Sequence, residues 1–474
     1  MAVKMIKIAI SSIAFLLALS SVGSNTINFQ SLSVHELAYT THEIDTSHST
    51  QLPRNFIYKK HQMTLELVHR DKMSTHGKKT YWHLFKEQLI RDSKRVAGLH
   101  RQLKNSSSRS FSYQLHDFGS AIVSGVEEGI GEYFVKIGIG SPPVDQYMVV
   151  DTGSDVTWVQ CKPCTQCYNQ ADPIFDPAGS ASFTRISCGS VACGLLDQAG
   201  KCGSGQCQYE VTYEDGSYTK GTLALENLKF GSTEVQNVAI GCGHHNLGLF
   251  AWASGLLGLG GGVMSLVGQL GSQTGGAFGY FLASPGSGSD GSLVFGRDAG
   301  IPTGAIWVPL LRNPLNHSFY YVGLVGLGVG GVRVVVPEEV FQLSEYGDGG
   351  AILDTGTAVT RLPVRAYETL REAFVNSTIG FPRADSVSLF DTCYDLSGFG
   401  TVGVPTISFF FSNGPELTLP AKNYLIPVDV HGTFCLAFAP SDSGLSIVGN
   451  IQQKGIQVSF DTVNGLAGFG PDTC

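Results

Sequence analysis

The sequence contains two copies of one short motif, an apolar run that ends in Asp-Thr-Gly and a hydroxyl residue. The first copy is Asp151-Thr152-Gly153-Ser154, and the second, 203 residues later, is Asp354-Thr355-Gly356-Thr357. Each apolar run predicts a buried strand. Each glycine, Gly153 or Gly356, lets backbone N–H groups approach the acidic side chain because it has no Cβ. Ser154 and Thr357 each add a hydroxyl donor for the same carboxylate.

A single Asp-Thr-Gly is also compatible with an ordinary strand-to-turn junction. Here the pairing extends further along the chain. Leu256-Leu257-Gly258 follows Asp151 by 107 residues, and Ile447-Val448-Gly449 follows Asp354 by 95 residues. Two halves of similar size that share both motifs indicate an internal duplication.

At these residues the sequence resembles the pepsin family of aspartic endopeptidases, over roughly residues 130 to 474. The resemblance implies an all-β, bilobed, pepsin-like fold with the active-site cleft between two β-lobes. It also implies that Asp151 and Asp354 form one shared catalytic site that hydrolyses peptide bonds in protein substrates. Ser154 and Thr357 match the outer hydrogen-bonding positions of that site.

Composition agrees with such a fold. The 474 residues suffice for more than one domain, Gly is abundant, charge is low, and short apolar runs alternate with turn residues, which is typical of β architectures. Residues 366–375 alone have a clear helical pattern within the body. We expect a signal peptide over residues 1–24, a prosegment over 25–120, a first lobe over 121–300 and a second lobe over 301–474, joined near residues 299–305.

The N-terminus has the three parts of a secretory signal peptide: Lys4 and Lys7, an apolar run over residues 8–19, and small residues up to Ser24. The run is too short for a stable membrane span. We therefore expect export to the extracellular space (the apoplast), with the vacuole or secretory pathway as the alternative. A chloroplast transit peptide is a second alternative. Such peptides are usually rich in Arg and Ser, however, and no Arg precedes Arg54.

Residues 25–120 differ from the body. Residues 63–69 alternate like a strand, and residues 81–96 carry apolar groups at helical spacing. In the pepsin family such a segment is an inhibitory prosegment. Residues 105–108 predict a flexible exit, with maturation cleavage between about 105 and 125.

Charge is divided between these parts. Residues 1–120 hold 16 Lys and Arg against 8 Asp and Glu, and the remainder holds 15 against 31. A basic leader and an acidic body favour electrostatic docking of the prosegment. A basic tail without a partner is the alternative. The acidic body does not indicate nucleic-acid binding.

The expected chemistry needs no cofactor and no metal. Two neighbouring carboxylates cannot both ionise cheaply, so they share one proton, as aspartic-protease pairs do. One carboxylate takes a proton from a trapped water while the other polarises the scissile carbonyl. Neither role is assigned to one residue.

The family also has a hairpin flap over the cleft. Tyr213 lies between two alternating runs and matches the flap tyrosine, and Trp158 matches the residue that steadies it. Glu214 replaces the usual glycine. The alternative is that Tyr213 is a cross-strand packing aromatic.

Eleven cysteines all follow residue 160, and seven of them lie between Trp158 and Tyr213. A zinc or iron–sulfur site is one interpretation of this spacing. Disulfides fit an exported chain better. The cluster resembles the insert of the plant nepenthesin- and nucellin-like branch of the family. That branch implies the pairs Cys161–Cys164, Cys167–Cys242, Cys188–Cys207, Cys193–Cys202 and Cys393–Cys435. Phe281 replaces the expected partner of Cys474.

Asn316 and Asn376 begin acceptor sequences for N-glycans. The glycine-rich run 326–331 has a dinucleotide-binding spacing but precedes a strand rather than a helix. His244-His245 has no evident third metal ligand.

The sequence thus predicts a secreted aspartic endopeptidase made as a zymogen, acting as a monomer on peptide substrates. The alternative is a catalytically silent binding or inhibitor protein with the same fold. Such relatives usually lose an Asp, a Gly or the flap Tyr, which this chain keeps.

Overall fold

The structure is a computed structural model of the chain. It describes residues 27–35, 37, 63–69, 81–107, 133–196, 199–213, 217–248, 250, 252–283, 291–296 and 304–470. The expected signal peptide, the region 108–130 that contains most of the expected cleavage range, residues 214–216 of the expected flap tip, and Cys474 lie outside these residues.

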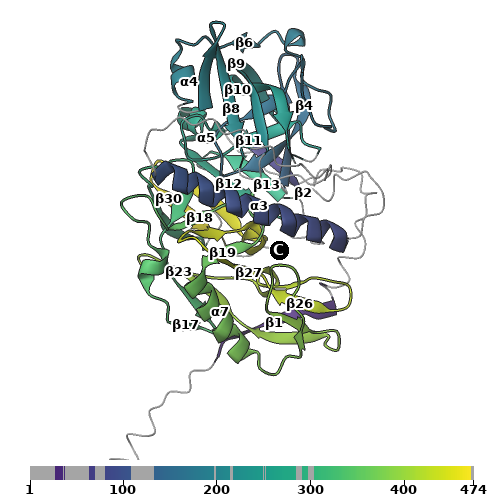
Figure 1. Cartoon of the computed structure of the whole chain (residues 1–474), viewed down its shortest axis with the longest axis vertical. Helices are drawn as coiled ribbons and strands as arrows, with labels where there is room; N and C mark the ends of the chain where they lie inside the picture. Colours follow the sequence, from purple (N-terminus) through teal and green to yellow (C-terminus); the bar gives the residue numbers. More distant parts are fainter. Residues whose placement is uncertain are drawn as a thin grey trace, which may run out of the picture.

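The fold is all-β and bilobed, as the sequence predicted (Figure 1). In the first lobe, the long strands β9 and β10 form an antiparallel hairpin that pairs with β5, β6 and β8. The first-lobe strands are β4 (Val144–Asp151), β5 (Trp158–Gln160), β6 (Thr184–Arg185), β7 (Gly200–Gly203), β8 (Gln206–Thr212), β9 (Tyr218–Phe230), β10 (Thr233–Leu247) and β11 (Gly255–Gly258).

The second lobe combines the strands around Asp354 with two four-stranded sheets, ordered β17-β16-β23-β24 and β20-β21-β26-β25. Its strands are β15 (Tyr320–Val322), β16 (Leu324–Val329), β17 (Val332–Arg333), β18 (Ala351–Leu353), β19 (Thr360–Pro363), β20 (Arg383–Ala384), β21 (Cys393–Asp395), β22 (Thr401–Pro405), β23 (Ile407–Phe411), β24 (Glu416–Thr418), β25 (Leu425–Pro427), β26 (Thr433–Leu436), β27 (Phe438–Ser441) and β28 (Ser446–Val448). The glycine-rich run 326–331 is part of the β16–β17 hairpin, which excludes a strand-to-helix phosphate loop there.

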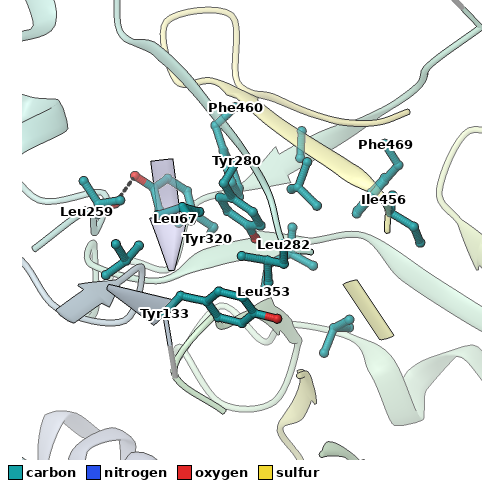
Figure 2. Packing of buried hydrophobic residues seen from close by; sticks show 14 of the residues in the cluster. Leu67, Tyr133, Leu259, Tyr280, Leu282, Tyr320, Leu353, Ile456, Phe460 and Phe469 are labelled. Atoms are coloured by element: carbon teal, nitrogen blue, oxygen red, sulfur yellow. Dashed lines mark hydrogen bonds between the residues drawn. The ribbon is translucent and has the colours of Figure 1, made fainter. Parts of the chain in front are cut away.

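One sheet joins the lobes, in the order β14-β30-β29-β12-β13-β2-β3. Its strands are β2 (Met63–His69), β3 (Tyr133–Ile139), β12 (Ala277–Phe281), β13 (Gly291–Phe295), β14 (Ile306–Leu311), β29 (Gln457–Asp461) and β30 (Leu466–Phe469). Figure 2 shows the core around this sheet, where the ring centroids of Tyr320 and Phe460 are 4.4 Å apart and the Tyr320 hydroxyl donates to the Leu259 carbonyl at 2.7 Å. Leu67 of β2 is buried in the same core.

The N-terminal segment therefore enters the fold at three places. Besides β2, strand β1 (Phe29–Ser33) pairs with β22 of the second lobe. Helix α3 (Tyr81–Ser107) lies across the molecule where the lobes meet (Figure 1). The predicted strand at 63–69 is thus confirmed. The predicted helix at 81–96 is longer than expected and includes residues 105–107, so these residues are helical rather than a flexible exit.

The predicted helix at 366–375 is confirmed as α7 (Val364–Ser377), whose buried face includes Tyr367, Leu370 and Phe374. Several other helices are single turns. They include α4 (Val191–Gly194), α5 (Leu266–Gln269), α6 (Gly271–Thr274), α8 (Asn450–Gln453), η2 (Pro177–Gly179), η4 (Glu338–Phe341) and η5 (Ala421–Asn423).

Candidate active site

Each Asp-Thr-Gly turn lies at the end of a strand with a parallel neighbour. β4 ends at Asp151 beside β11, and the Asp151 carbonyl accepts from the Leu259 N–H at 2.9 Å. β18 ends one residue before Asp354 beside β28, and the Asp354 N–H donates to the Val448 carbonyl at 3.2 Å. The two apolar-apolar-Gly segments noted in the sequence provide these neighbouring strands.

The two carboxylates have matching hydrogen bonds. Oδ1 of Asp151 accepts from the Gly153 N–H at 3.1 Å, and Oδ2 accepts from the Ser154 hydroxyl at 2.6 Å. Oδ1 of Asp354 accepts from the Gly356 N–H at 3.0 Å, and Oδ2 accepts from the Thr357 hydroxyl at 2.5 Å. Asp151 and Asp354 are 1% and 0% exposed, so these donors replace the water that an ionised carboxylate needs.

The middle residues of the two motifs connect the lobes, a role that the sequence analysis did not assign to them. The Thr355 N–H donates to the Thr152 hydroxyl at 3.1 Å, and the Thr152 N–H donates to the Thr355 hydroxyl at 3.3 Å. Because these bonds are reciprocal and buried, they set the separation of the adjacent carboxylates.

A basic side chain of α3 bridges the pair. Nη2 of Arg95 donates to Oδ1 of Asp151 at 2.7 Å and to Oδ1 of Asp354 at 2.8 Å, and its Nε donates to Oδ2 of Asp354 at 2.8 Å. Arg95 is 5% exposed. Burial alone would lower the pKa of the Arg95 guanidinium, but the two facing carboxylates outweigh burial and raise it, so Arg95 stays charged.

The glycines of the motifs make this contact possible. A Cβ on Gly153 would lie 2.6 Å from Nη2 of Arg95, and a Cβ on Gly356 would lie 2.3 Å from its Cζ. Sequence reasoning placed a docking helix at residues 81–96 but did not select Arg95. The sequence did contain one signal for Arg95: it is a basic residue on an amphipathic helix that was expected to dock on an acidic body.

α3 is held on the second lobe by apolar and charged contacts. Phe85 and Leu89 join a buried cluster with Val359 and Phe390. One helical turn before Arg95, Asp92 forms a buried ion pair with Arg361. Neither Asp92 nor Arg361 was selected from the sequence, because their pairing joins residues 269 positions apart.

The expected flap residues lie together. The Trp158 indole N–H donates to the Tyr213 hydroxyl at 2.6 Å, and the Tyr213 N–H donates to the Ser217 carbonyl at 2.7 Å, next to the turn of the β8–β9 hairpin. Phe250 packs against both rings. Burial raises the pKa of Tyr213 well above its ordinary value, so its hydroxyl stays neutral.

A cavity of about 1100 Å³ beside the pair is lined by both lobes and by α3; its lining includes Asp151, Asp155, Tyr213, Asn316 and Arg95. Asp155 was not selected from the sequence. Its carboxylate accepts from the Ser318 hydroxyl at 2.6 Å and from the Gly262 N–H at 3.0 Å. Burial raises the pKa of Asp155, the two donors partly offset this, and the charge of Asp151 adds to it.

One of the two expected glycan sites, Asn316, lies in the wall of this cavity. Asn316 is 7% exposed, and its side-chain oxygen accepts from the Ser318 N–H at 3.0 Å, so the structure makes Asn316 a poor acceptor. Asn376 is exposed on α7.

Five disulfides include all ten cysteines that the structure describes. They are Cys161–Cys242, Cys164–Cys167, Cys188–Cys202, Cys193–Cys207 and Cys393–Cys435. The last pair is as expected. The other four correct the expected pairs Cys161–Cys164, Cys167–Cys242, Cys188–Cys207 and Cys193–Cys202.

Strand pairing explains the corrections. Cys161 directly follows β5, which runs parallel to β10, so the buried Cys161 lies beside Cys242. Cys193 packs against the core cluster that contains Cys207, whereas Cys188 binds the turn of the β7–β8 hairpin and meets Cys202 outside that cluster.

The described residues do not support a metal site in this region. None of the ten described cysteines is a thiolate, and no group of three or more His, Cys, Asp or Glu among the described residues is placed to hold a metal ion.

A two-lobed β fold with one buried Asp-Thr-Gly turn from each lobe defines the class of pepsin-like aspartic endopeptidases. Two family models match, Xylanase inhibitor N-terminal over residues 133–297 and Xylanase inhibitor C-terminal over 319–471. The protein ASPARTIC PROTEASE IN GUARD CELL 2 of Arabidopsis thaliana is 60% identical over 87% of each chain. Nepenthesin-2 of Nepenthes gracilis is 39% identical over 83% of this chain and 87% of its own. The chain belongs to the plant pepsin-like aspartic proteases, and it is an aspartic-type endopeptidase.

Solved structures support the fold. A structure titled edgp has a TM-score of 0.61 at 21% identity, covering 71% of this chain and 91% of that chain. Basic 7S globulin from soybean has a TM-score of 0.59 at 19% identity, covering 73% and 94%. Among the described residues, no helix combines the length and apolarity needed to span a membrane.

Proposed function

We propose that the chain is the zymogen of an exported aspartic endopeptidase in which Asp151 and Asp354 are the catalytic pair. The observation that carries this proposal is the Arg95 guanidinium, which binds both carboxylates at once from a helix of the N-terminal segment. A segment that neutralises both acids and fills the space between them must leave before a peptide can bind.

The position of Arg95 also indicates where the reacting water belongs. Nη2 stands within 2.7 and 2.8 Å of the Oδ1 atoms of Asp151 and Asp354, which is hydrogen-bond distance for a water shared by the two carboxyls. The ionised carboxyl takes a proton from that water, whose oxygen bonds to the scissile carbonyl carbon. The protonated carboxyl donates to the carbonyl oxygen, and the resulting diol breaks down as the leaving nitrogen takes a proton. The pair acts as a unit.

The neighbouring residues would support this chemistry. Ser154 and Thr357 hold the outer oxygens, and the Gly153 and Gly356 N–H groups hold the inner ones. Tyr213, fixed by the Trp158 indole, would close over a bound peptide.

Release of the segment must break the ion pairs of Arg95 with Asp151 and Asp354. Asp92 does not favour release in acid: burial raises its pKa in the docked state, which the facing Arg361 only partly offsets. A carboxyl whose pKa is higher when docked binds its proton more tightly there, so protonation of Asp92 favours docking.

We further propose that the N-terminal signal exports the chain and that its cysteines are oxidised to disulfides. We also propose that the protein is a monomer and that Asn376 carries a glycan. The ten disulfide-bonded cysteines support an oxidising compartment.

The test is hydrolysis of a fluorogenic peptide by the acid-treated full-length protein across about pH 3–7, the range in which carboxyl pairs titrate, with and without pepstatin. Asp151→Asn should abolish cleavage, because the site then no longer has two carboxyls to share the acid and base roles. Lys136→Gln, on the first-lobe surface, is the matched control. No cleavage by a folded, processed wild-type protein would contradict the proposal and favour a silent binding or inhibitor protein.

A further inference from the structure

The docked helix presents an acidic side chain to the second lobe one turn before Arg95. Oδ1 of Asp92 accepts from the backbone N–H groups of Ala358 and Val359, the latter at 3.1 Å. Oδ2 accepts from Nη2 of Arg361 at 2.5 Å. Asp92 is 3% exposed and Arg361 is 4% exposed, so the contact is buried on both sides.

The cradle belongs to the second lobe rather than to the helix. The Asn450 N–H donates to the Thr357 carbonyl at 2.7 Å and the Ile451 N–H donates to the Ala358 carbonyl at 3.0 Å, which anchors the backbone that supplies the two N–H groups. Nη1 of Arg361 donates to the Val359 carbonyl at 3.0 Å, so the guanidinium is held from its own lobe. The bonds that hold these three donors therefore lie within the second lobe and do not involve α3.

The cradle lies close to the expected scissile bond. Asp92 and Arg95 are three residues apart on α3, which is about 4.5 Å along a helix axis. An extended peptide advances about 3.3 Å per residue. A substrate carbonyl placed where Arg95 binds would therefore put a side chain one or two residues away in front of Arg361.

We propose that Arg361 and the N–H groups of Ala358 and Val359 form a substrate subsite for an acidic side chain, and that Asp92 occupies this subsite in the zymogen. The inference rests on the proposed peptidase function and extends it to the substrate class. Two N–H donors and one guanidinium match a carboxylate, whereas an apolar side chain would offer these donors no acceptor.

The test uses acid-activated full-length protein and a set of C-terminally amidated peptides, so that no terminal carboxylate competes. The peptides differ at one position, scanned over the two residues on each side of the scissile bond, which carries Asp, Asn, Glu, Gln or Leu. At one of these positions we expect kcat/KM for Asp or Glu to exceed that for the matching amide by roughly 10- to 100-fold, as for charge-assisted hydrogen bonds.

The Asp-to-Asn ratio is measured at about pH 5.5, above the ordinary Asp pKa of about 3.9, so that the free peptide carries an ionised carboxyl. Arg361→Gln should bring the ratio close to one, and Arg361→Lys should keep part of it. Arg365→Gln, an equal charge change on an exposed residue of α7, should leave the ratio unchanged.

The outcomes separate the two proposals. Equal cleavage of acidic and amide peptides by a wild-type protein whose activity Asp151→Asn abolishes would overturn the subsite and leave the peptidase function intact. Absence of any cleavage that depends on Asp151 would overturn the peptidase function itself. If Arg361→Gln does not fold, the wild-type ratios and Arg361→Lys still decide.

Discussion

At the residue scale, Arg95 bridges the buried carboxylates of Asp151 and Asp354, and we propose that it blocks them as a catalytic pair. Replacing it by Gln removes the charge that faces Asp151 and Asp354 and leaves two buried carboxylates together, which should weaken docking of the N-terminal segment by about 3–5 kcal/mol. We expect Arg95→Gln to cleave a short peptide before any processing occurs. Peptide turnover and the intact chain on a gel should be measured in the same samples.

Lys86→Gln is the matched control for this prediction, because Lys86 is an exposed cation of the same helix. If Arg95→Gln stays as inactive as Lys86→Gln until processing, Arg95 is not the inhibitory group.

A second residue-scale prediction concerns Asp155. Because burial raises its pKa in the folded state, the folded protein binds a proton more tightly than the unfolded chain. The contribution of Asp155 to stability therefore decreases as pH rises from its ordinary range through the raised pKa. Asp155→Asn can keep a bond to the Gly262 N–H and carries no charge.

We therefore expect the melting temperature of Asp155→Asn, relative to wild type, to increase with pH. Thermal unfolding of both zymogens at several pH values between about 3 and 7, around the ordinary Asp pKa, measures this difference. A difference that is constant with pH would show that Asp155 does not titrate in this range.

At the element scale, the apolar face of α3 holds the helix against the second lobe. Leu89 is 1% exposed within the second-lobe cluster, whereas its neighbour Ile90 is 47% exposed. Leu89→Ala should weaken docking by about 2–4 kcal/mol, as for buried leucines, and should speed acid processing. Ile90→Ala changes the same helix by a similar volume and should have little effect. Equal processing rates for the two variants would contradict this packing.

At the scale of the whole molecule, the N-terminal segment is part of the fold. β2 lies between β13 and β3 in the sheet that joins the lobes, and Arg95 neutralises the buried carboxylates. We expect the processed form to melt below the full-length chain, because processing would remove β2 from this sheet and the Arg95 guanidinium from the two carboxylates. Calorimetry of both forms at one neutral pH tests this. Equal melting temperatures would contradict a structural role of the segment.

Local patterns in the sequence were sufficient for much of the fold. The alternation at residues 63–69 predicted β2, and the helical spacing at 366–375 predicted α7. Both predictions were possible because the spacing of apolar residues along a strand or helix depends only on which of its faces packs against the core. The doubled Asp-Thr-Gly located the two carboxylates because each turn, its N–H donor and its hydroxyl donor lie within four consecutive residues.

The sequence by itself determined the two lobes, the carboxylate turns, and the contact between Trp158 and Tyr213 expected from the family resemblance. Only the tertiary structure decided the four disulfide partners in the first lobe, since the Cys161–Cys242 pair depends on the pairing of β5 with β10 across 81 residues. It also decided which cation of α3 meets Asp151 and Asp354, and that Asp92 meets Arg361. Composition and spacing specify which groups a chain carries, but their partners follow from strand register and helix rotation, which the packing of the whole chain sets.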